Sequence, residues 1–180
     1  DVWFKSKLKN DTEIGFGWSH EEPIAEMLKS HVSSYRELPV SVHQFQNKLR
    51  NEVRAKSGIM RCREFIMKDM YSFHRTEEDM KAYYERMKKS YARIFERMGI
   101  GARTYLTYAS GGSFSKYSHE FQTLTEAGED VIYICDTCRV AINKEIIEDQ
   151  KHACPICGNE DLRIETSVEV GNIFELKTKY

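Results

Sequence analysis

The chain has 180 residues, of which 41% are hydrophobic and 31% are charged, a composition typical of a folded globular protein. Its 27 Lys and Arg residues nearly balance its 28 Asp and Glu residues, so no overall basic field attracts nucleic acid and any RNA contact is expected to be local. No apolar run reaches the length of a membrane span, and no signal sequence opens the chain. We therefore expect a cytoplasmic protein with no membrane contact, and a start at Asp1 without Met suggests a fragment.

The first half of the chain predicts one helix and two strands. Apolar residues recur at helical spacing between residues 19 and 35. Residues 40–53 alternate, with Phe45, Leu49 and Val53 on the predicted apolar face and polar residues on the other. A second strand is expected over residues 60–73, after a basic stretch that ends at Gly58 and suits a hairpin loop.

The second half begins with the clearest helix, which Thr76 can cap and Gly99 can end. Its predicted apolar stripe consists of Met80, Tyr83, Met87, Tyr91, Ile94 and Met98. The Gly- and Ser-rich residues 109–118 read as a loop, and residues 131–134 as a buried strand.

Four of the five cysteines form two C-x-x-C pairs that are separated by fifteen residues, namely Cys135, Cys138, Cys154 and Cys157. Two such knuckles can close a tetrahedron of sulfurs around one zinc ion, and four protein ligands leave no open position, so a structural Zn²⁺ is predicted. The alternatives are a pair of disulfides or one redox-active pair, neither of which explains two matched knuckles. We expect Cys62 to be a small core residue and His152 to have no metal role.

A hairpin of the two predicted strands would gather cations, a carboxylate and a ring on one surface. These residues are Arg50, Glu52, Arg61, Arg63 and Phe65. Guanidinium groups suit phosphate oxygens and an aromatic ring can stack on a purine, so this surface can hold a nucleotide. Spacing alone favours the simpler alternative of a solvated sheet face with ion pairs.

Residues 45–74 resemble motif 2 of bacterial-type prolyl-tRNA synthetases almost throughout. The resemblance implies that Arg50 contacts the α-phosphate of ATP or the adenylate as the catalytic group, and that Glu52 faces the adenine end. It further implies that Arg61 is a second ATP contact and that Phe65 stacks on adenine; Arg63 shares their surface.

Two further elements resemble the proline site of that family. Residues 17–22 resemble its G-P-T-H-E-E element, which implies that Ser19 and Glu21 bind the imino group of proline, although Trp18 and Pro23 depart from the pattern. The alternative, compatible with this role, is that Ser19 caps a helix. The other implied proline contacts are Gly111, Gly112, Ser118 and His119, with a longer loop between the glycines and Ser118 than the family has.

The resemblance implies an α+β fold, with the antiparallel sheet of class II synthetases flanked by helices. A catalytic core segment is expected over residues 1–130, a zinc-ribbon insert over 131–166, and a return to the core over 167–180. The insert occupies the place where many relatives carry an editing domain, and it is too short for such a domain, so editing in cis is not expected.

The implied reaction is ATP- and Mg²⁺-dependent activation of proline to prolyl-adenylate, followed by transfer to tRNA(Pro), in an enzyme that is a homodimer at full length. The alternative is a non-catalytic synthetase-like binding module, or a fragment that lacks motif 3. A zinc-ribbon protein that binds nucleic acid is a third alternative. The acidic residues of the insert disfavour it, namely Glu145, Glu148, Asp149, Glu160 and Asp161.

Overall fold

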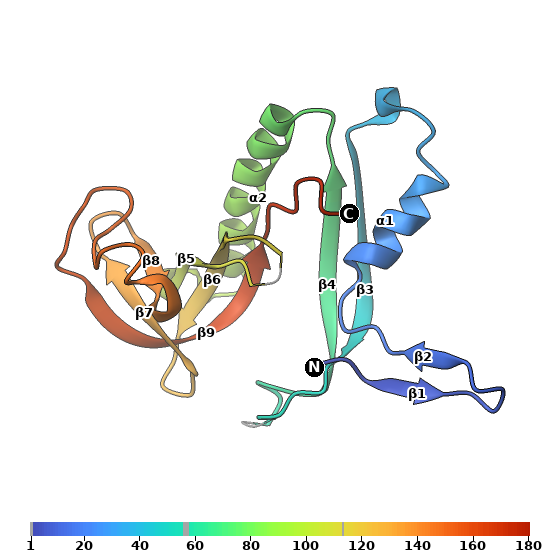
Figure 1. The fold of residues 1–180 in the computed structure, drawn as a ribbon. Coiled ribbons are helices and arrows are strands. Elements are labelled where there is room, and N and C mark those ends of the chain that lie inside the picture. The colour runs from blue at the N-terminus through green and yellow to red at the C-terminus, as the bar shows by residue number, and fades with distance from the viewer. Residues whose placement is uncertain (1, 56–57, 113) are drawn as a thin grey trace. The chain divides into compact units, whose positions relative to one another are not determined.

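A computed structural model describes residues 2–55, 58–112 and 114–180, which divide into two compact units (Figure 1). The first unit extends to Met80 and includes Tyr180, and the second comprises Lys81–Lys179. In the described part of the chain, no helix combines the length and the apolar character that crossing a membrane requires.

The first unit consists of a small hairpin, a short helix and a long hairpin. Its elements are β1 (Lys5–Lys7), β2 (Glu13–Gly15), α1 (Glu21–Lys29), the 3₁₀ helix η1 (Tyr35–Glu37), β3 (Val40–Leu49) and β4 (Glu64–Phe73). The helix is shorter than predicted because the Ser30 hydroxyl donates to the Met27 carbonyl oxygen at 2.7 Å and so competes with the helical pattern in the last turn. The two long strands are shorter than predicted, because β3 ends at Leu49 and β4 begins only at Glu64.

The β3–β4 pair is antiparallel, with a register that runs from Val40 opposite Phe73 to Leu49 opposite Glu64. This register places Lys48 beside Phe65 on one face and Phe45 beside Lys68 on the other. Lys48 is 1% exposed and Phe45 is 72% exposed, so the strand buries Lys48 of its predicted polar face and exposes Phe45 of its predicted apolar face. Burial of the Lys48 ammonium is tolerated because Asp69 pairs with it at 2.7 Å.

The second unit contains most of α2 (Glu77–Arg97) and a closed barrel with the strand order β5-β6-β9-β7-β8. The strands are β5 (Thr104–Ser110), β6 (Tyr117–Leu124), β7 (Asp130–Cys135), β8 (Val140–Asn143) and β9 (Arg163–Ile173), with the 3₁₀ helices η2 (Gly101–Arg103) and η3 (Lys144–Ile146) between them. All pairs are antiparallel except β5–β8, so the sheet is mixed rather than purely antiparallel. The predicted strand over residues 131–134 is confirmed as part of β7.

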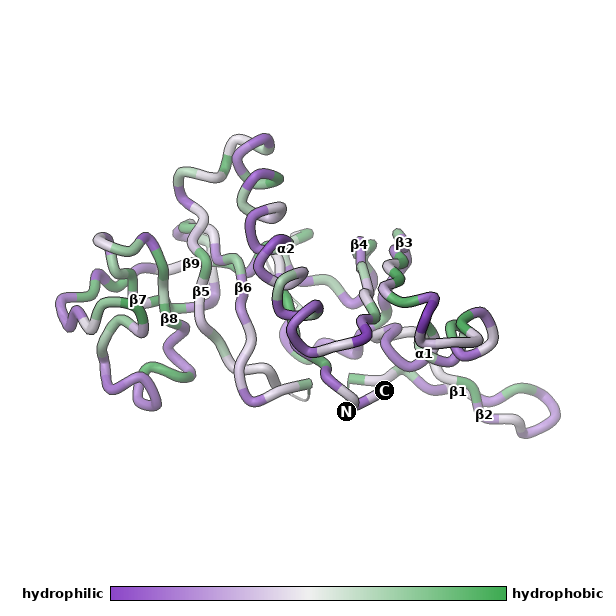
Figure 2. Tube along the Cα trace, turned by 90° about the horizontal axis from the view of Figure 1, so that it is seen from above, coloured by the Kyte–Doolittle hydropathy of each residue, from purple (hydrophilic) through white to green (hydrophobic). Residues whose placement is uncertain are grey.

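Apolar side chains from three strands meet inside the barrel. Tyr105, Ile132, Ile134 and Ala141 form one buried cluster, and Figure 2 shows hydrophobic residues concentrated along β7 and β8. Polar residues share the interior, with Thr107, Gln122 and Ser167 all at 0% exposure. The Ser167 hydroxyl donates to Gln122 Oε1 at 3.0 Å, so part of the polar interior is satisfied internally.

Helix α2 uses only part of the predicted stripe: Met80, Tyr83, Met87 and Tyr91 are half-buried, whereas Ile94 and Met98 are exposed. Its start is as expected, because Thr76 Oγ1 accepts a hydrogen bond from the Asp79 backbone N–H, and Gly99 follows its end with a φ of 77°. The buried side chains are Tyr84 and Phe95, whereas Ile94 is 47% exposed. The reason is aromatic packing, since the Phe95 ring lies 5.4 Å from the ring of Phe121 on β6.

Candidate active site and metal centre

The residues predicted to bind the adenylate lie at the loop end of the β3–β4 hairpin. The Arg50 backbone N–H donates to the Arg63 carbonyl oxygen at 2.8 Å and so continues the pairing beyond Leu49. The Arg50 guanidinium carbon lies 5.3 Å from the centre of the Phe65 ring. A planar cation and an aromatic ring are thus adjacent, as the predicted face requires.

Glu52 holds the arginines of this surface in place. Its Oε1 accepts from the Arg54 backbone N–H at 3.1 Å, which together with Arg61 lowers the pKa of its carboxyl group. Arg61 Nη1 lies 3.6 Å from Glu52 Oε2, and Arg63 Nε donates to the Glu52 carbonyl oxygen at 3.0 Å. The structure therefore brings all five predicted residues together, and it also contains the ion pair of the simpler alternative.

The loop that carries Ser19 and Glu21 leads directly into α1. The residue before the helix is His20, which makes no side-chain cap hydrogen bond. The Ser19 hydroxyl donates instead to the Glu21 carboxylate, so the alternative in which Ser19 caps the helix is wrong. The two predicted imino-group contacts are therefore neighbours in space within the first unit.

The Gly111–Gly112 turn joins β5 to β6 in the second unit. A Cβ atom at Gly111 would overlap the Ser115 backbone, and Gly112 has a φ of 55°, so both positions require glycine. Ser118 follows on β6, where it is 3% exposed and its hydroxyl donates to the Ser110 carbonyl oxygen at 2.9 Å. These contacts close the base of the turn.

His119 points to the opposite side of β6 from Ser118 and contacts Tyr84 of α2. The Tyr84 hydroxyl donates to the Ile173 carbonyl oxygen at 3.0 Å and lies 2.9 Å from His119 Nδ1, so it accepts the Nδ1–H proton. Nε2 is then an unprotonated acceptor, and it has no hydrogen-bond partner among the described residues. Burial, and then Lys88, lower the pKa of His119 to about 4, so its imidazole is neutral at physiological pH.

Sequence reasoning missed the polar groups that support these sites. Tyr84 orients His119, and the buried pair of Lys48 and Asp69 lies beside the loop that carries Ser19. A lysine inside an alternating strand carries no signal of burial by itself. Its partner Asp69 lies opposite Gln44, and only the register reveals that proximity.

The four predicted metal ligands form one cluster. The sulfur atoms of Cys135, Cys138, Cys154 and Cys157 all lie within 4.8 Å of one another. A tetrahedral zinc site with Zn–S bonds of about 2.3 Å places its sulfurs about 3.8 Å apart, and the Cys135 and Cys157 sulfurs are 3.7 Å apart. None of the five cysteines forms a disulfide. Cys62 is only half-buried and its Sγ lies 3.5 Å from the Gly58 carbonyl oxygen, so the prediction that it is a core residue is wrong.

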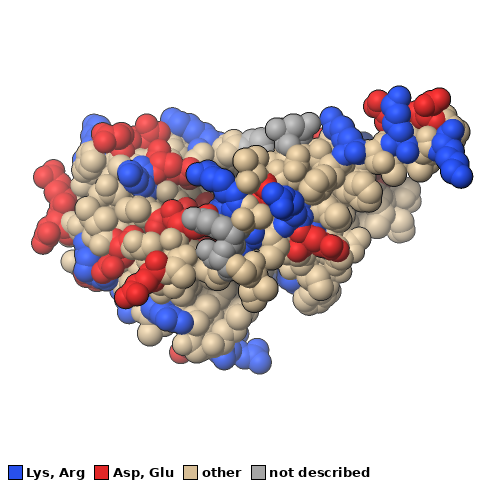
Figure 3. Space-filling view, turned by 90° about the horizontal axis from the view of Figure 1, so that it is seen from below, with Lys and Arg blue, Asp and Glu red and all other residues tan. Residues whose placement is uncertain are grey.

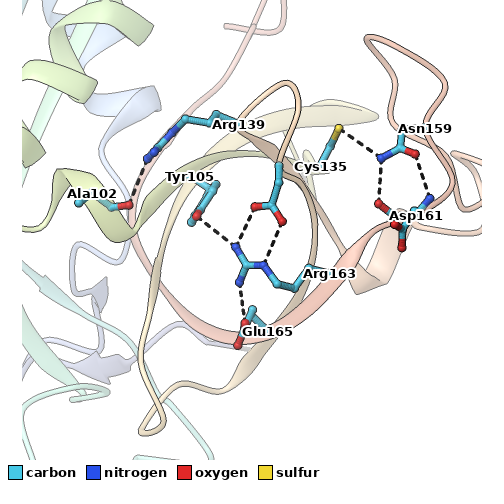
Figure 4. Close-up of polar contacts among 9 residues, drawn as sticks. Ala102, Tyr105, Cys135, Arg139, Asn159, Asp161, Arg163 and Glu165 are labelled. Carbon is cyan, nitrogen blue, oxygen red and sulfur yellow. Dashed lines mark hydrogen bonds and ion pairs between the residues drawn. The ribbon is translucent and has the colours of Figure 1, made fainter.

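Polar contacts fix the first knuckle against β9 (Figure 4). Arg163 donates to both carboxylate oxygens of Asp136, at 3.0 and 3.2 Å, and to the Tyr105 hydroxyl at 3.3 Å. The Asn159 side-chain amide lies 3.9 Å from the Cys135 sulfur and donates to the Asp161 carbonyl oxygen at 2.8 Å. A donor aimed at a ligand sulfur is the outer-shell support that metal thiolates commonly have.

The clustered thiols perturb one another. The Cys138 backbone N–H lowers the pKa of Cys135 to about 7, whereas the hydrogen bond to Cys157 raises the pKa of Cys138 to about 12. Four thiolates at this spacing require a dication, which fits the donor set of a structural zinc site.

Exposed acidic side chains of the predicted insert disfavour a nucleic-acid role for it. The five acidic residues that count against such a role in the sequence, Glu145, Glu148, Asp149, Glu160 and Asp161, are all exposed, and Figure 3 shows carboxylates gathered on one face of the second unit. Phosphate backbones are repelled by such a surface.

Comparison with known proteins places these features in a family context. The model of the tRNA synthetase class II core domain (G, H, P, S and T) matches residues 4–180. The proline–tRNA ligase of Citrifermentans bemidjiense is 46% identical over 145 residues, which are 79% of this chain and 25% of that protein. The proline–tRNA ligase of Prochlorococcus marinus is 42% identical over 167 residues, which are 92% of this chain and 28% of that protein. The chain thus spans about a quarter of the length of these relatives.

A solved structure has a similar fold. The prolyl-tRNA synthetase from Cryptosporidium parvum, in a crystal structure with L-proline and AMP, matches with a TM-score of 0.59. The match covers 68% of this chain and 26% of that chain at 17% sequence identity. Likeness at this identity bears on the fold alone.

Proposed function

Because this chain belongs to the class II core-domain family of tRNA synthetases, we propose that the polypeptide carrying it is a proline–tRNA ligase. It activates proline with ATP and transfers the prolyl group to tRNA(Pro). The observation that carries the proposal is the meeting of Arg50 and Phe65, with Glu52 and two more arginines, in a segment whose relatives are proline–tRNA ligases. The Arg50 guanidinium can bind a phosphate of a nucleotide, and the Phe65 ring can stack on the base of the same nucleotide.

The reaction needs no side-chain nucleophile. The proline carboxylate attacks the α-phosphorus of ATP and pyrophosphate leaves, so the residues of the site act by position and charge. The Arg50 guanidinium stabilises charge that develops at the α-phosphate, and its Nε donates to the Trp18 carbonyl oxygen at 3.1 Å, which orients the guanidinium plane. Mg²⁺, when bound with ATP, supplies further neutralisation at the outer phosphates.

The remaining nucleotide and amino-acid contacts follow the family pattern. Arg61 and Arg63 bind the phosphates, Phe65 stacks on adenine, and Glu52 faces its edge. For proline, the proposed contacts are Ser19 and Glu21 in the first unit, and Gly111, Gly112, Ser118 and His119 in the second. His119 enters this proposal as a neutral imidazole, because burial lowers its pKa to about 4.

The cysteine cluster is proposed to hold a structural Zn²⁺ in a ribbon over residues 131–166, inserted between core segments 1–130 and 167–180. This insert stands where related enzymes have an editing domain. Proline, ATP and tRNA(Pro) are the proposed partners, in a cytoplasmic homodimer.

The test is proline-dependent ATP–pyrophosphate exchange by the whole polypeptide that carries these residues. Arg50→Ala should lower the exchange rate by about 100-fold or more, because one charge-stabilising contact typically contributes that much. Phe65→Ala should mainly raise the KM for ATP. Exchange at a near-normal rate in Arg50→Ala would contradict the assignment.

The wild-type protein provides the control for the substrate. Exchange that requires glycine, histidine, serine or threonine instead of proline would overturn the proposed specificity. Nucleotide binding without exchange for any amino acid would favour the non-catalytic binding module.

A further inference from the structure

We propose that buried Lys48 acts through His20 as a positioning residue for the loop of residues 17–21, which presents Ser19 and Glu21 to the substrate amine. The inference rests on the proposed function, because it assigns a role in amino-acid recognition to that loop. It adds Lys48, His20 and Asp69, which lie outside the contacts proposed above.

Lys48 connects β3 to the loop through its ammonium group. Its Nζ lies 2.7 Å from Asp69 Oδ2 and 2.7 Å from His20 Nδ1, and the residue is 1% exposed. An ammonium group can only donate, so His20 Nδ1 must accept and the ring proton must lie on Nε2. Burial and the nearby Lys48 charge also lower the pKa of His20, in agreement with a neutral ring.

The ammonium group is itself held in a fixed place. Asp69 Oδ2 also accepts from Gln44 Nε2 at 2.8 Å and from the Tyr71 hydroxyl at 2.8 Å. Gln44 and Lys48 belong to β3, whereas Asp69 and Tyr71 belong to β4. Donors from both strands therefore converge on one carboxylate oxygen, and rigid sheet elements fix the position from which Lys48 reaches the loop.

Two further hydrogen bonds attach the loop to the residues that follow Lys48. The Leu49 backbone N–H donates to the Gly17 carbonyl oxygen at 2.9 Å, and Arg50 Nε donates to the Trp18 carbonyl oxygen at 3.1 Å. Three consecutive residues, the last two of β3 and Arg50 directly after it, thus hold positions 17, 18 and 20. Ser19 lies between the held positions, and its hydroxyl contacts the carboxylate of Glu21.

Gly17 leaves the space that the His20 ring occupies. A Cβ atom at Gly17 would lie 2.7 Å from His20 Cε1 and 2.8 Å from Nε2, so any side chain there would push the ring out of place. The ring therefore fits between Gly17 and the Lys48 ammonium group. This fit determines the path of the backbone between Ser19 and Glu21.

The alternative is a buried ion pair that only stabilises the hairpin. The two roles differ in kinetics, because a displaced recognition loop impairs binding of the amino acid, whereas a less stable hairpin lowers the amount of active enzyme. A misplacement of about 1 Å can cost on the order of 100-fold in rate. The nucleotide contacts of Arg50 and Phe65 should be less sensitive to His20, because the Leu49–Gly17 hydrogen bond holds the backbone next to Trp18 independently of the His20 ring.

The experiment replaces His20 and keeps the Lys48–Asp69 pair intact, since removal of Lys48 would leave a buried carboxylate without its cation. His20→Ala removes the acceptor, whereas His20→Asn retains an oxygen close to the position of Nδ1. Both variants are made in the whole polypeptide, and KM values for proline and for ATP are measured by pyrophosphate exchange. We expect His20→Ala to raise the KM for proline about 10-fold or more, with the KM for ATP changed less than about 2-fold and His20→Asn close to the wild type.

Gly17→Ala provides a second test that removes no polar group. It should raise the KM for proline in the same way, and it decides the question if His20→Ala does not fold. An unchanged KM for proline in the folded variants, or parallel rises of both KM values, would overturn the inference. Wild-type protein without proline-dependent exchange would instead overturn the proposed function and, with it, the role of the loop.

Discussion

Glu120 is a carboxylic acid inside the barrel of the second unit. It is 8% exposed, and its Oε2 accepts from Gln122 Nε2 at 2.9 Å and from Asn143 Nδ2 at 3.3 Å. Burial, and then the charge of Glu169, raise the pKa of Glu120 to about 7. The folded protein therefore holds this proton more tightly than an unfolded chain does.

A pKa raised by folding makes the barrel less stable as pH increases. The favourable contribution is complete below the ordinary glutamate pKa of 4.5 and is lost as pH rises through about 7. Because one pKa unit corresponds to about 1.4 kcal/mol, the loss is on the order of 3 kcal/mol. Glu120→Gln should remove most of this pH dependence and stabilise the protein at pH 8, as measured by urea unfolding at pH 5 and pH 8.

Glu126→Gln is the matched control for that measurement, because Glu126 is exposed. It should retain the wild-type difference between the two pH values. Equal pH dependence in Glu120→Gln and the wild type would contradict the assignment of the buried proton.

The sequence predicts which residues share a face better than it predicts which face is covered. The predicted alternation groups Arg50 and Glu52 with Arg61, Arg63 and Phe65. The structure also brings these five together, although only Phe65 lies within the regular strands, which stop at Leu49 and Glu64. The alternation also places Lys48 on the polar face, although this residue is in fact buried. Burial depends on partners from distant positions, here Asp69 and His20, and no local pattern encodes them.

At the scale of the element, α2 packs through aromatic rings. The Tyr91 ring lies 4.8 Å from the Phe121 ring and 6.0 Å from the Phe95 ring. The caps of this helix were predictable because they depend on local chemistry at Thr76 and Gly99. The phase of its stripe was not, because several aliphatic and aromatic residues fit helical spacing and the barrel surface selects among them.

Neighbouring positions on α2 test this packing. Phe95 is 5% exposed and Ile94 is 47% exposed. Phe95→Ala should therefore lower the free energy of unfolding by about 3–5 kcal/mol, whereas Ile94→Ala should cost less than about 1 kcal/mol. Urea denaturation of the two variants measures both changes. Equal losses of unfolding free energy would contradict this packing and support the predicted stripe, which includes Ile94.

At the scale of the whole molecule, the nucleotide face and the cysteine cluster belong to different compact units. The cluster was predictable because C-x-x-C spacing is a local signature of metal binding. The closure of β7 and β8 into a barrel with β5 was not, since the parallel β5–β8 contact joins segments that are more than thirty residues apart.

Removal of metal should consequently have a local effect. Metal analysis should find one zinc per chain, which Cys135→Ser removes and Cys62→Ser leaves in place. Chelation should increase hydrogen exchange around residues 135–139 and 153–161 and leave β3 and β4 protected. Loss of protection in β3 and β4 upon chelation would contradict the independence of the two units.

The register of β7 has a consequence for how this protein can change in evolution or by engineering. Ile132 pairs with Asn143 on one side and with Glu165 on the other. The ends of the segment between these two residues therefore lie two strand spacings apart, about 10 Å. A module whose own termini are separated by that distance can replace the second knuckle while β8 and all of β9 after Ile164 stay in place, so this position can accept domains of very different size.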